Sequence, residues 1–295
     1  VQIACLATRA GCALILKGGS EARFSNTILA SVLQSVLPQG ALSLLHTRAE
    51  VSALLENPDS TKLIDLVVPR GSNTLVRTIQ ASTKIPVLGH ADGVCHVFVD
   101  RAASLDKATE LVLDSKCDYP AACNAAEPLL IHKDFPHSKE LLSTLSSEIL
   151  LKAGDNAISL GLLPEEARAA DLSVEYGDKT MLVEVVESAT AAVAFVNANS
   201  SNHTDCIVTE DHQVATTFIR DVDSACVFHN ASTRFSDGFR FGLGAELGVA
   251  TGRLHARGPV GVQGFLTYKW CLRSDDVHTQ HQFASNLKTY THKEL

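Results

Sequence analysis

The sequence predicts an α/β protein in which most strands run parallel. Short apolar segments typical of buried strands recur along the first half of the chain, at residues 12–17, 64–69 and 95–99. Segments with helical periodicity separate them, for example at residues 47–57 and 105–116. Strands that alternate with amphipathic helices form βαβ units, and the strands of such units are parallel. The alternation starts again after residue 120, so we expect two α/β units in one chain.

Local signals define the ends of the elements in the first half. The strand at 12–17 ends at Lys17, before two glycines, and Ser20 is predicted to cap the helix that follows. That helix must end before Pro38, because a residue that precedes proline is displaced from helical geometry. The other elements expected in this half are strands at 64–69, 85–89 and 95–99 and helices at 47–57, 74–81 and 105–116, the last capped by Ser104.

The second half repeats the pattern with other segments. We expect strands at 129–132, 181–186, 206–209 and 224–229, helices at 138–151, 188–198 and 214–220, and a short helix near 164–166. Glycine is frequent from Phe235 onward, which predicts loops that lead to a strand at 264–272. The chain therefore divides into a first unit at 1–120, a second at 121–245, a return segment at 246–272 and a polar tail at 273–295.

The composition excludes several classes of protein. Of the 295 residues, 45% are apolar and 20% charged, and the net charge of −8 argues against nucleic acid or an anionic membrane as the main partner. No apolar run is long enough to span a membrane. Eight cysteines without a CxxC pair are typical of reduced intracellular thiols, and the histidines lack the spacing of a metal site. The chain begins without methionine and inside a helical pattern, which suggests a piece of a longer protein.

Cys123 is the candidate nucleophile. It follows Pro120 on a connection of small residues and precedes the strand at 129–132. A thiol on such a connection can remain open to a substrate and be surrounded by backbone N–H groups. The alternative is that Cys123 is simply buried, as most free cysteines are, and the local pattern does not decide between the two.

Two turns that contain glycine suggest a dinucleotide site. Lys17 and Gly18 lie at the carboxyl end of a strand, where open α/β sheets bind ligands. Gly71 and Ser72 likewise follow a strand and open a helix whose dipole favours a phosphate. Each turn alone could equally be an ordinary turn. The glycines at 242, 244 and 248 do not have the spacing of a G-x-G-x-x-G motif and follow no apolar strand, so we reject them as a nucleotide site.

A run of polar side chains suggests an anionic ligand. Residues 228–235 (FHNASTRF) place hydroxyl and guanidinium groups between aromatic residues, and Arg257 lies on a later turn rich in glycine. Arginine and hydroxyl donors suit carboxylate or phosphate oxygens. Each arginine alone is more often a surface charge, but together they favour a substrate site.

Several stretches resemble the gamma-glutamyl phosphate reductases of the aldehyde dehydrogenase superfamily. They are residues 69–72 (PRGS), 87–93 (VLGHADG), 118–124 (DYPAACN), 203–205 (HTD) and the run 230–261. The similarity covers nearly the whole chain up to about residue 272. In detail, the residues of these stretches resemble the reductase half of plant-like bifunctional delta-1-pyrroline-5-carboxylate synthases.

The resemblance implies an aldehyde dehydrogenase-like α/β fold with a Rossmann-type cofactor domain and an α/β catalytic domain. Residues 1–120 would be the remainder of the NADP-binding domain, whose N-terminal part is missing, and residues 121–245 would form the catalytic domain with the cysteine. Residues 246–272 would return to the cofactor-binding and oligomerisation region. The implied protein is a homo-oligomer of the cytoplasm or plastid, with a glutamate 5-kinase domain fused upstream.

The resemblance also implies roles for single residues. Cys123 matches the catalytic cysteine, and Lys17 matches the lysine that meets the adenosine ribose or its 2′-phosphate, with Gly18 beside it. Gly71 and Ser72 lie where the pyrophosphate is held, and Glu175 resembles the glutamate that contacts the nicotinamide ribose. The residues implied for the substrate, L-glutamyl 5-phosphate, are Asn124, Asn230, Ser232, Thr233, Arg234 and Arg257.

The implied reaction is the NADPH-dependent reduction of L-glutamyl 5-phosphate to L-glutamate 5-semialdehyde and phosphate, a step of proline biosynthesis. Hydrolytic aldehyde dehydrogenases keep a general-base glutamate upstream of the cysteine, whereas residues 88–93 (LGHADG) contain none. This difference suits an enzyme whose acyl group passes to phosphate, because a base that activates water would hydrolyse the acyl enzyme. A hydrolytic aldehyde dehydrogenase and a non-catalytic or regulatory remnant remain the alternatives.

Overall fold

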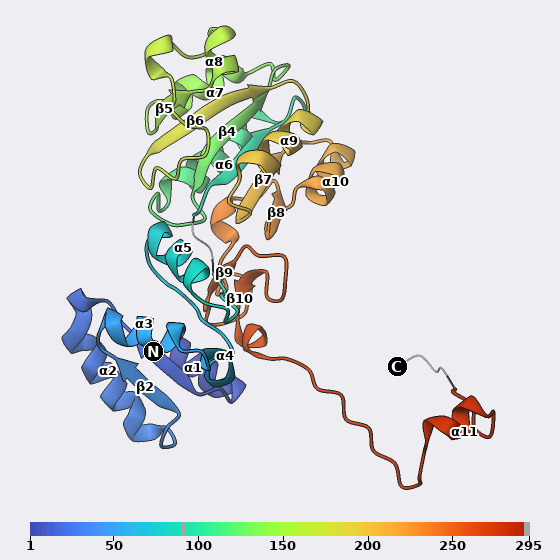
Figure 1. Ribbon diagram of the computed structural model, residues 1–295. Coiled ribbons are helices and arrows are strands. Elements are labelled where there is room, and N and C mark those ends of the chain that lie inside the picture. Colours follow the sequence, from blue (N-terminus) through green and yellow to red (C-terminus); the bar gives the residue numbers. More distant parts are fainter. Residues whose placement is uncertain (90–91, 292–295) are drawn as a thin grey trace. The chain divides into compact units, whose positions relative to one another are not determined.

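The computed structural model describes residues 1–89 and 92–291, and its largest element is a six-stranded parallel sheet (Figure 1). The strands follow the order β5-β6-β4-β3-β7-β8, and each neighbouring pair is parallel. Their bounds are Cys95–Val99 for β3, Ala126–His132 for β4, Leu150–Ala153 for β5, Thr180–Val186 for β6, Thr204–Val208 for β7 and Cys226–His229 for β8.

Helices cover both faces of this sheet. One apolar cluster joins the sheet to α6 (Leu105–Cys117), α7 (Ser138–Leu145) and α8 (Asp155–Ser159). A second cluster joins the other face to α9 (Ala189–Asn199) and α10 (His212–Asp221), as Figure 1 shows. Because both faces are covered, the strands are apolar along most of their length rather than alternating.

A smaller parallel pair forms the first part of the chain. β1 (Leu14–Lys17) pairs with β2 (Leu42–Leu45). Leu42 packs with Ala4 of the first helix and Ala30 of the second in one apolar cluster. The helices of this part are α1 (Gln2–Ala10), α2 (Arg23–Val36), α3 (Arg48–Glu56), α4 (Ser60–Leu63) and α5 (Asn73–Ser82), with a 3₁₀ turn, η1, at Ser20–Ala22.

The segment after β8 returns to the apolar cluster around Leu6 and Leu88. It forms η3 (Thr233–Phe235), an antiparallel pair of β9 (Gly248–Ala250) and β10 (Gly258–Val260), and η4 (Val262–Phe265). Leu247 and Val260 from this segment complete the cluster. The chain divides into two compact units, Val1–Phe265 and Leu266–Leu295, and the second unit contains the short helix α11 (Gln280–Ala284).

Most predicted elements are confirmed, and the differences have physical reasons. The helix predicted at 138–151 ends at Leu145, because the last residues of that segment pair with β6 as β5. The strands predicted at 64–69 and 85–89 reduce to a single bridge between Val67 and Val87. Ser20 does not cap α2, which begins three residues later, and β2 was not predicted. The short helix predicted near 164–166 is the 3₁₀ turn η2 (Glu165–Ala167).

The strand predicted at 264–272 does not form within the described residues. Phe265 ends η4, and the following residues have no regular structure. Tyr268, Trp270 and Leu272 are 91%, 95% and 96% exposed, since no neighbouring strand in the described part of the chain pairs with them.

The predicted division at residue 120 is not where the sheets divide. β3 and α6 precede that residue, yet β3 pairs with both β4 and β7 at the centre of the six-stranded sheet. We therefore propose that the catalytic unit begins near Val94, at the start of β3.

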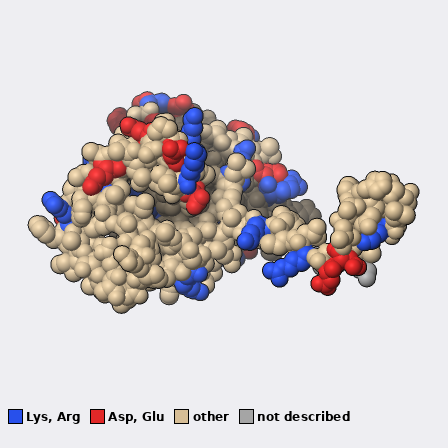
Figure 2. Space-filling view, turned by 60° about the horizontal axis from the view of Figure 1, so that its bottom comes forward, with Lys and Arg blue, Asp and Glu red and all other residues tan. Residues whose placement is uncertain are grey.

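Among the described residues, none of the helices has the length and apolar character needed to cross a membrane. Figure 2 shows one face of the molecule, on which basic and acidic side chains lie in small mixed groups.

Phe98 provides a test of the core. It is fully buried in β3 and stacks on Phe218, with 5.9 Å between the ring centroids. Phe98→Ala should lower the free energy of unfolding by about 3–5 kcal/mol, because it removes a large buried side chain and leaves a cavity. Denaturant unfolding measures the loss. Phe239→Ala, at a residue that is 78% exposed, is the control, and an equal effect of both variants would contradict the assigned core.

Candidate active site

Cys123 lies on the connection between α6 and β4, at the amino edge of the six-stranded sheet. The helix ends at Cys117, and two turns follow: the N–H of Ala122 donates to the carbonyl of Tyr119 (3.0 Å), and that of Ala125 to the carbonyl of Ala122 (2.9 Å). Small side chains keep this connection compact. Cys123 is partly buried and does not lie in the hydrophobic interior.

The chain that enters β3 packs directly against Cys123. A side chain at the buried Gly93 would overlap the backbone of Cys123, so only glycine fits there. Two residues later, the Cys95 thiol donates to the carbonyl oxygen of Cys123 at 3.3 Å. Because β3 and β4 are neighbouring parallel strands, their entering segments meet at the same edge of the sheet. Gly93 and Cys95 therefore fix the backbone that carries the candidate nucleophile.

Charged groups from three distant segments surround the thiol. The N–H of Gly93 donates to Glu175 Oε2 at 3.1 Å, and the N–H of Gly238 donates to Glu246 Oε2 at 2.7 Å. Burial raises the pKa of the Cys123 thiol to about 11, and the carboxylates of Glu246 and Glu175 contribute to the increase. The guanidinium of Arg70 acts in the opposite direction. At neutral pH the thiol is therefore mostly protonated in this arrangement.

Two backbone N–H groups next to the thiol are candidate donors, and that of Cys123 lies within hydrogen-bonding reach of its own sulfur. In the described part of the chain, the N–H groups of Cys123 and Asn124 donate to no other backbone carbonyl. The Asn124 side chain is engaged separately, because its Nδ2 donates to the carbonyl of Ser236 at 2.9 Å and to that of Arg234 at 3.4 Å. The asparagine thus ties the segment after β8 to the nucleophile connection, and the two N–H groups can bind an oxyanion.

The predicted substrate residues divide into two groups. Ser232 and Thr233 are buried close to α6, since the Ser115 hydroxyl contacts that of Ser232 at 3.2 Å and accepts from the N–H of Thr233 at 3.2 Å. Arg234 pairs with Asp118 at 3.1 Å, five residues before the cysteine. These three residues are connected to the nucleophile segment.

Asn230 and Arg257 are engaged elsewhere. Asn230 lies at the carboxyl end of β8, at the edge opposite to Cys123, and its side chain both accepts from the N–H of Thr209 (3.0 Å) and donates to its carbonyl (2.9 Å). Arg257 Nη1 pairs with Asp223 at 2.9 Å, and Nη2 donates to the carbonyl of the same residue at 2.9 Å. The structure therefore does not bring these two predicted residues to the thiol.

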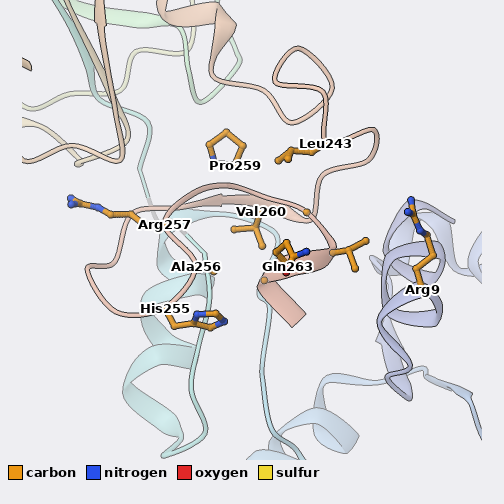
Figure 3. Close-up of a pocket in the computed structure, with 11 residues that line it drawn as sticks. Arg9, Leu243, His255, Ala256, Arg257, Pro259, Val260 and Gln263 are labelled. Carbon is orange, nitrogen blue, oxygen red and sulfur yellow. The ribbon is translucent and has the colours of Figure 1, made fainter. Parts of the chain in front are cut away.

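Arg257 instead lines a pocket of about 350 Å³ with Arg9 of α1 and the segment 255–264 (Figure 3). In this view Arg9 and Arg257 come from opposite sides, so their charges do not converge. Cys123 is not among the lining residues. The pocket is accordingly separate from the candidate nucleophile.

The predicted cofactor residues lie on two strand-to-helix connections. Lys17 is the last residue of β1 and is exposed, and Gly18 lets Asn26 of α2 approach and donate to the carbonyl of Gly19 at 3.3 Å. Ser72 caps α5, its hydroxyl accepting from the N–H of Leu75 at 3.4 Å. Gly71 precedes it with a φ of 156°, which favours glycine.

These connections fit a dinucleotide. The exposed Gly71 and Ser72 present the N-terminus of a ten-residue helix, where backbone N–H groups and the helix dipole favour phosphate. Lys17 supplies a cation and Glu175 an exposed acceptor for hydroxyl groups. Among the described residues, no group of three or more His, Cys, Asp or Glu is arranged to hold a metal ion.

The sequence prediction did not include Arg70, Gly93, Cys95 and Glu246 as site residues. Arg70 and Gly93 belong to stretches that carry the family resemblance, so a signal existed for them. Glu246 lies within the run 230–261, which also carries the resemblance, but that run was predicted as loops and only the fold shows its carboxylate close to the thiol. His90 and Ala91, part of the stretch without a general-base glutamate, lie outside the described residues.

The pKa of Cys123 predicts how alkylation of the thiol depends on pH. The thiolate is the reactive form, so the rate of its modification by iodoacetamide should rise about tenfold per pH unit up to about pH 11, rather than level off near pH 8.5. Glu175→Gln or Glu246→Gln should lower the midpoint, and Arg70→Gln should raise it. Mass spectrometry of the Cys123 peptide measures the rate, and a midpoint near pH 8 in the unaltered protein would contradict the described surroundings.

Comparisons with known proteins agree on the family. The sequence profile of the aldehyde dehydrogenase family matches residues 1–167. The chain is 52% identical over its full length to delta-1-pyrroline-5-carboxylate synthase A of Arabidopsis thaliana, of which it spans 41%. It is 47% identical, again over its full length, to gamma-glutamyl phosphate reductase of Synechococcus sp. (strain WH7803), of which it spans 68%.

A solved structure gives the same result for the fold. The crystal structure of gamma-glutamyl phosphate reductase from Thermotoga maritima superposes with a TM-score of 0.84 and 31% identity, covering 94% of this chain and 69% of that one. The predicted aldehyde dehydrogenase-like α/β fold is therefore confirmed. The chain belongs to the gamma-glutamyl phosphate reductases of the aldehyde dehydrogenase family.

Proposed function

We propose that this chain carries the nucleophile of an NADPH-dependent gamma-glutamyl phosphate reductase. The reaction converts L-glutamyl 5-phosphate into L-glutamate 5-semialdehyde and phosphate, in proline biosynthesis. The observation that carries the proposal is the position of Cys123, a partly buried thiol on a compact turn with two adjacent backbone N–H groups and a nearby guanidinium. The names of the relatives support the substrate.

The cysteine forms a covalent intermediate in this proposal. The Cys123 thiolate attacks the acyl carbon of the substrate, the bond from that carbon to the phosphate oxygen breaks, and phosphate leaves with the bonding electron pair. The product of this step is a thioester on Cys123. The N–H groups of Cys123 and Asn124 stabilise the oxyanion that forms on the acyl oxygen during attack.

Arg70 is the cation that we assign to the departing phosphate. The arginines predicted from the sequence are already paired, Arg234 with Asp118 and Arg257 with Asp223. Arg70 lies against Gly248, where no side chain intervenes, and lowers the pKa of Cys123. Among the described residues it forms no ion pair, so its guanidinium can bind an anion close to the thiol and stabilise the thiolate as well.

Two buried polar atoms of the predicted substrate residues lack partners in the described part of the chain. They are Thr233 Oγ1 and Asn124 Oδ1. A buried polar atom without a partner is costly, and a substrate group can satisfy it. We assign the Thr233 hydroxyl to the substrate carboxylate as a donor and Asn124 Oδ1 to the α-ammonium as an acceptor. Ser232 supports this region through its contact with Ser115, whereas Asn230 and Arg257 lie away from the thiol and receive no substrate contact in this proposal.

NADPH would be held by Lys17 and Gly18 at the adenosine end, by Gly71 and Ser72 at the pyrophosphate, and by Glu175 at the nicotinamide ribose. When bound, the cofactor supplies the hydride that reduces the thioester and releases the semialdehyde. Lys17 is the residue suited to a 2′-phosphate, because its exposed ammonium can pair with the additional negative charge.

The assembly is also a proposal. We expect a homo-oligomer, with residues 266–272 as a candidate interface strand. Leu266, Tyr268, Trp270 and Leu272 alternate with polar residues and are exposed, and this period of two is that of a strand that requires a partner. The relative from Arabidopsis thaliana is more than twice as long, which supports a glutamate 5-kinase domain fused upstream. The cytoplasm or the plastid is the location that we propose from the family resemblance.

The hydrolytic aldehyde dehydrogenase remains the second candidate, because the thiol chemistry is the same until the thioester forms. The two differ in the acyl acceptor. In the reverse direction, a reductase requires phosphate to release the acyl group from Cys123, whereas a hydrolase uses water. Dependence of NADP⁺ reduction on phosphate with the semialdehyde as substrate distinguishes them.

Cys123→Ala tests the nucleophile. In the complete protein it should lower turnover about a thousandfold or more, because no other group can form the acyl intermediate, and should leave NADPH binding within about twofold. Steady-state kinetics and fluorescence titration of NADPH measure the two effects. Cys117→Ala, at the end of the preceding helix, is the control, and near-normal turnover of Cys123→Ala would refute the proposal.

Arg70→Gln tests the phosphate contact. It should raise the KM for phosphate in the reverse reaction about tenfold to a hundredfold, since a charge-assisted contact to the phosphate is lost. Arg70→Lys keeps the positive charge and should therefore raise this KM less. Arg220→Gln, which removes an exposed arginine paired with Asp221, is the matched control. An unchanged KM for phosphate in Arg70→Gln would exclude Arg70 from the phosphate site.

A further inference from the structure

A fully buried ion pair flanks the nucleophile connection. Lys116, in the last turn of α6, and Glu127, the second residue of β4, are 0% and 1% exposed in their side chains, and Nζ lies 2.6 Å from Oε2. Cys123 lies between them in the sequence. The proposed chemistry uses neither residue, and a buried pair is seldom more stable than apolar residues of the same volume. Its presence at this place therefore requires a reason.

The second oxygen of Glu127 holds the segment that carries Glu175. Its Oε1 accepts from the N–H of Gly177 at 3.3 Å, and the N–H of Tyr176 also bonds to this carboxylate. Lys116 Nζ lies 6.0 Å from the centre of the Tyr176 ring, over its face. Gly177 has a φ of 68°, so the chain turns sharply at the contact. The ion pair thus binds two consecutive residues that directly follow Glu175.

Glu175 needs such an anchor because little else fixes it. Residues 169–179 have no helix or strand, and the Glu175 side chain is exposed. Even so, its carboxylate reaches the N–H of Gly93, which packs against Cys123. A flexible segment with an exposed side chain would lose this contact for part of the time. The backbone contacts to Glu127 restrict that motion.

We propose that Lys116 and Glu127 are positioning residues, whose buried ion pair fixes the backbone at Tyr176 and Gly177 and thereby keeps the carboxylate of Glu175 beside Gly93 and Cys123. Burial raises the pKa of Glu127 to about 7, and the Lys116 ammonium opposes this rise, which favours the ionised carboxylate. The ionised carboxylate is a stronger acceptor for the backbone N–H groups. The pair acts through Glu175 and touches neither substrate nor thiol. The role of Glu175 in the reaction rests on the proposed function, but its placement does not.

Alkylation of Cys123 in the complete protein tests this placement without substrate or cofactor. Lys116→Met/Glu127→Leu removes both charges together, so the net charge near the thiol is unchanged and the pair is replaced by apolar side chains. If Glu175 loses its position, the midpoint pH for alkylation by iodoacetamide should fall, as we also predict for Glu175→Gln, which removes the charge. We expect about half a pH unit or more for each.

The double-mutant cycle gives the decisive comparison. In a Glu175→Gln background the same replacement of the pair should have no further effect on the midpoint, because the carboxylate that it positions is gone. Lys116→Arg, which keeps the ion pair, should retain the original midpoint. Lys179→Met is the matched control, since Lys179 lies in the same stretch but pairs with the exposed Glu148 at 2.9 Å. It should leave the midpoint unchanged.

Two results would overturn the proposal. One is a folded Lys116→Met/Glu127→Leu protein, with the circular dichroism of the original, whose alkylation profile is unchanged. The other is an equal shift with and without the Glu175 carboxylate. If the double variant does not fold, Glu127→Gln with the same cycle provides the test. Failure of the reductase assignment would leave these alkylation profiles interpretable, because they require no turnover.

Discussion

The close approach of Gly93 to the backbone of Cys123 is the constraint on which the site depends. Parallel pairing of β3 with β4 brings the two entering segments to one edge of the sheet, and a side chain at position 93 would separate them. The N–H of the same glycine donates to Glu175, so one residue without a side chain connects the thiol to a carboxylate from a distant segment of the chain. The Cys95 thiol and the Asn124 amide then fix the rest of the connection.

The electrostatic consequence is a thiol that is held in its neutral form. Burial and two carboxylates outweigh one guanidinium, which raises the pKa of Cys123 to about 11. A cysteine in that state resists oxidation and modification, since the thiolate is the reactive species. In the proposed mechanism its reactivity therefore depends on how a bound anion, Arg70 and the backbone N–H groups redistribute charge around it. Placing Glu175 accurately matters for the same reason.

The sequence predicted the layered α/β fold well, because apolar strands and helix periodicity are local patterns. The nucleophile role of Cys123 stays a prediction, since small residues around a cysteine suit both a reactive thiol and a buried one. The sequence prediction failed where long-range pairing decides. The segment at 150–153 is a strand only because it lies beside β6. β3 belongs to the six-stranded sheet although the second unit was predicted to begin only after residue 120. For the site, Arg257 and Asn230 have the right chemical groups, yet Asp223 and Thr209 bind them. No local pattern shows which partner an arginine will find.

The central claim is that Cys123 carries the acyl group, and trapping the acyl enzyme tests it most directly. The complete protein is mixed with the semialdehyde and NADP⁺ in the absence of phosphate, quenched in acid and digested, and the peptide that contains Cys123 is weighed by mass spectrometry. We predict a glutamyl adduct on that peptide, absent from the peptides of the other cysteines, that disappears when phosphate is added before the quench. An unmodified Cys123 peptide under conditions where NADP⁺ is reduced would contradict the account.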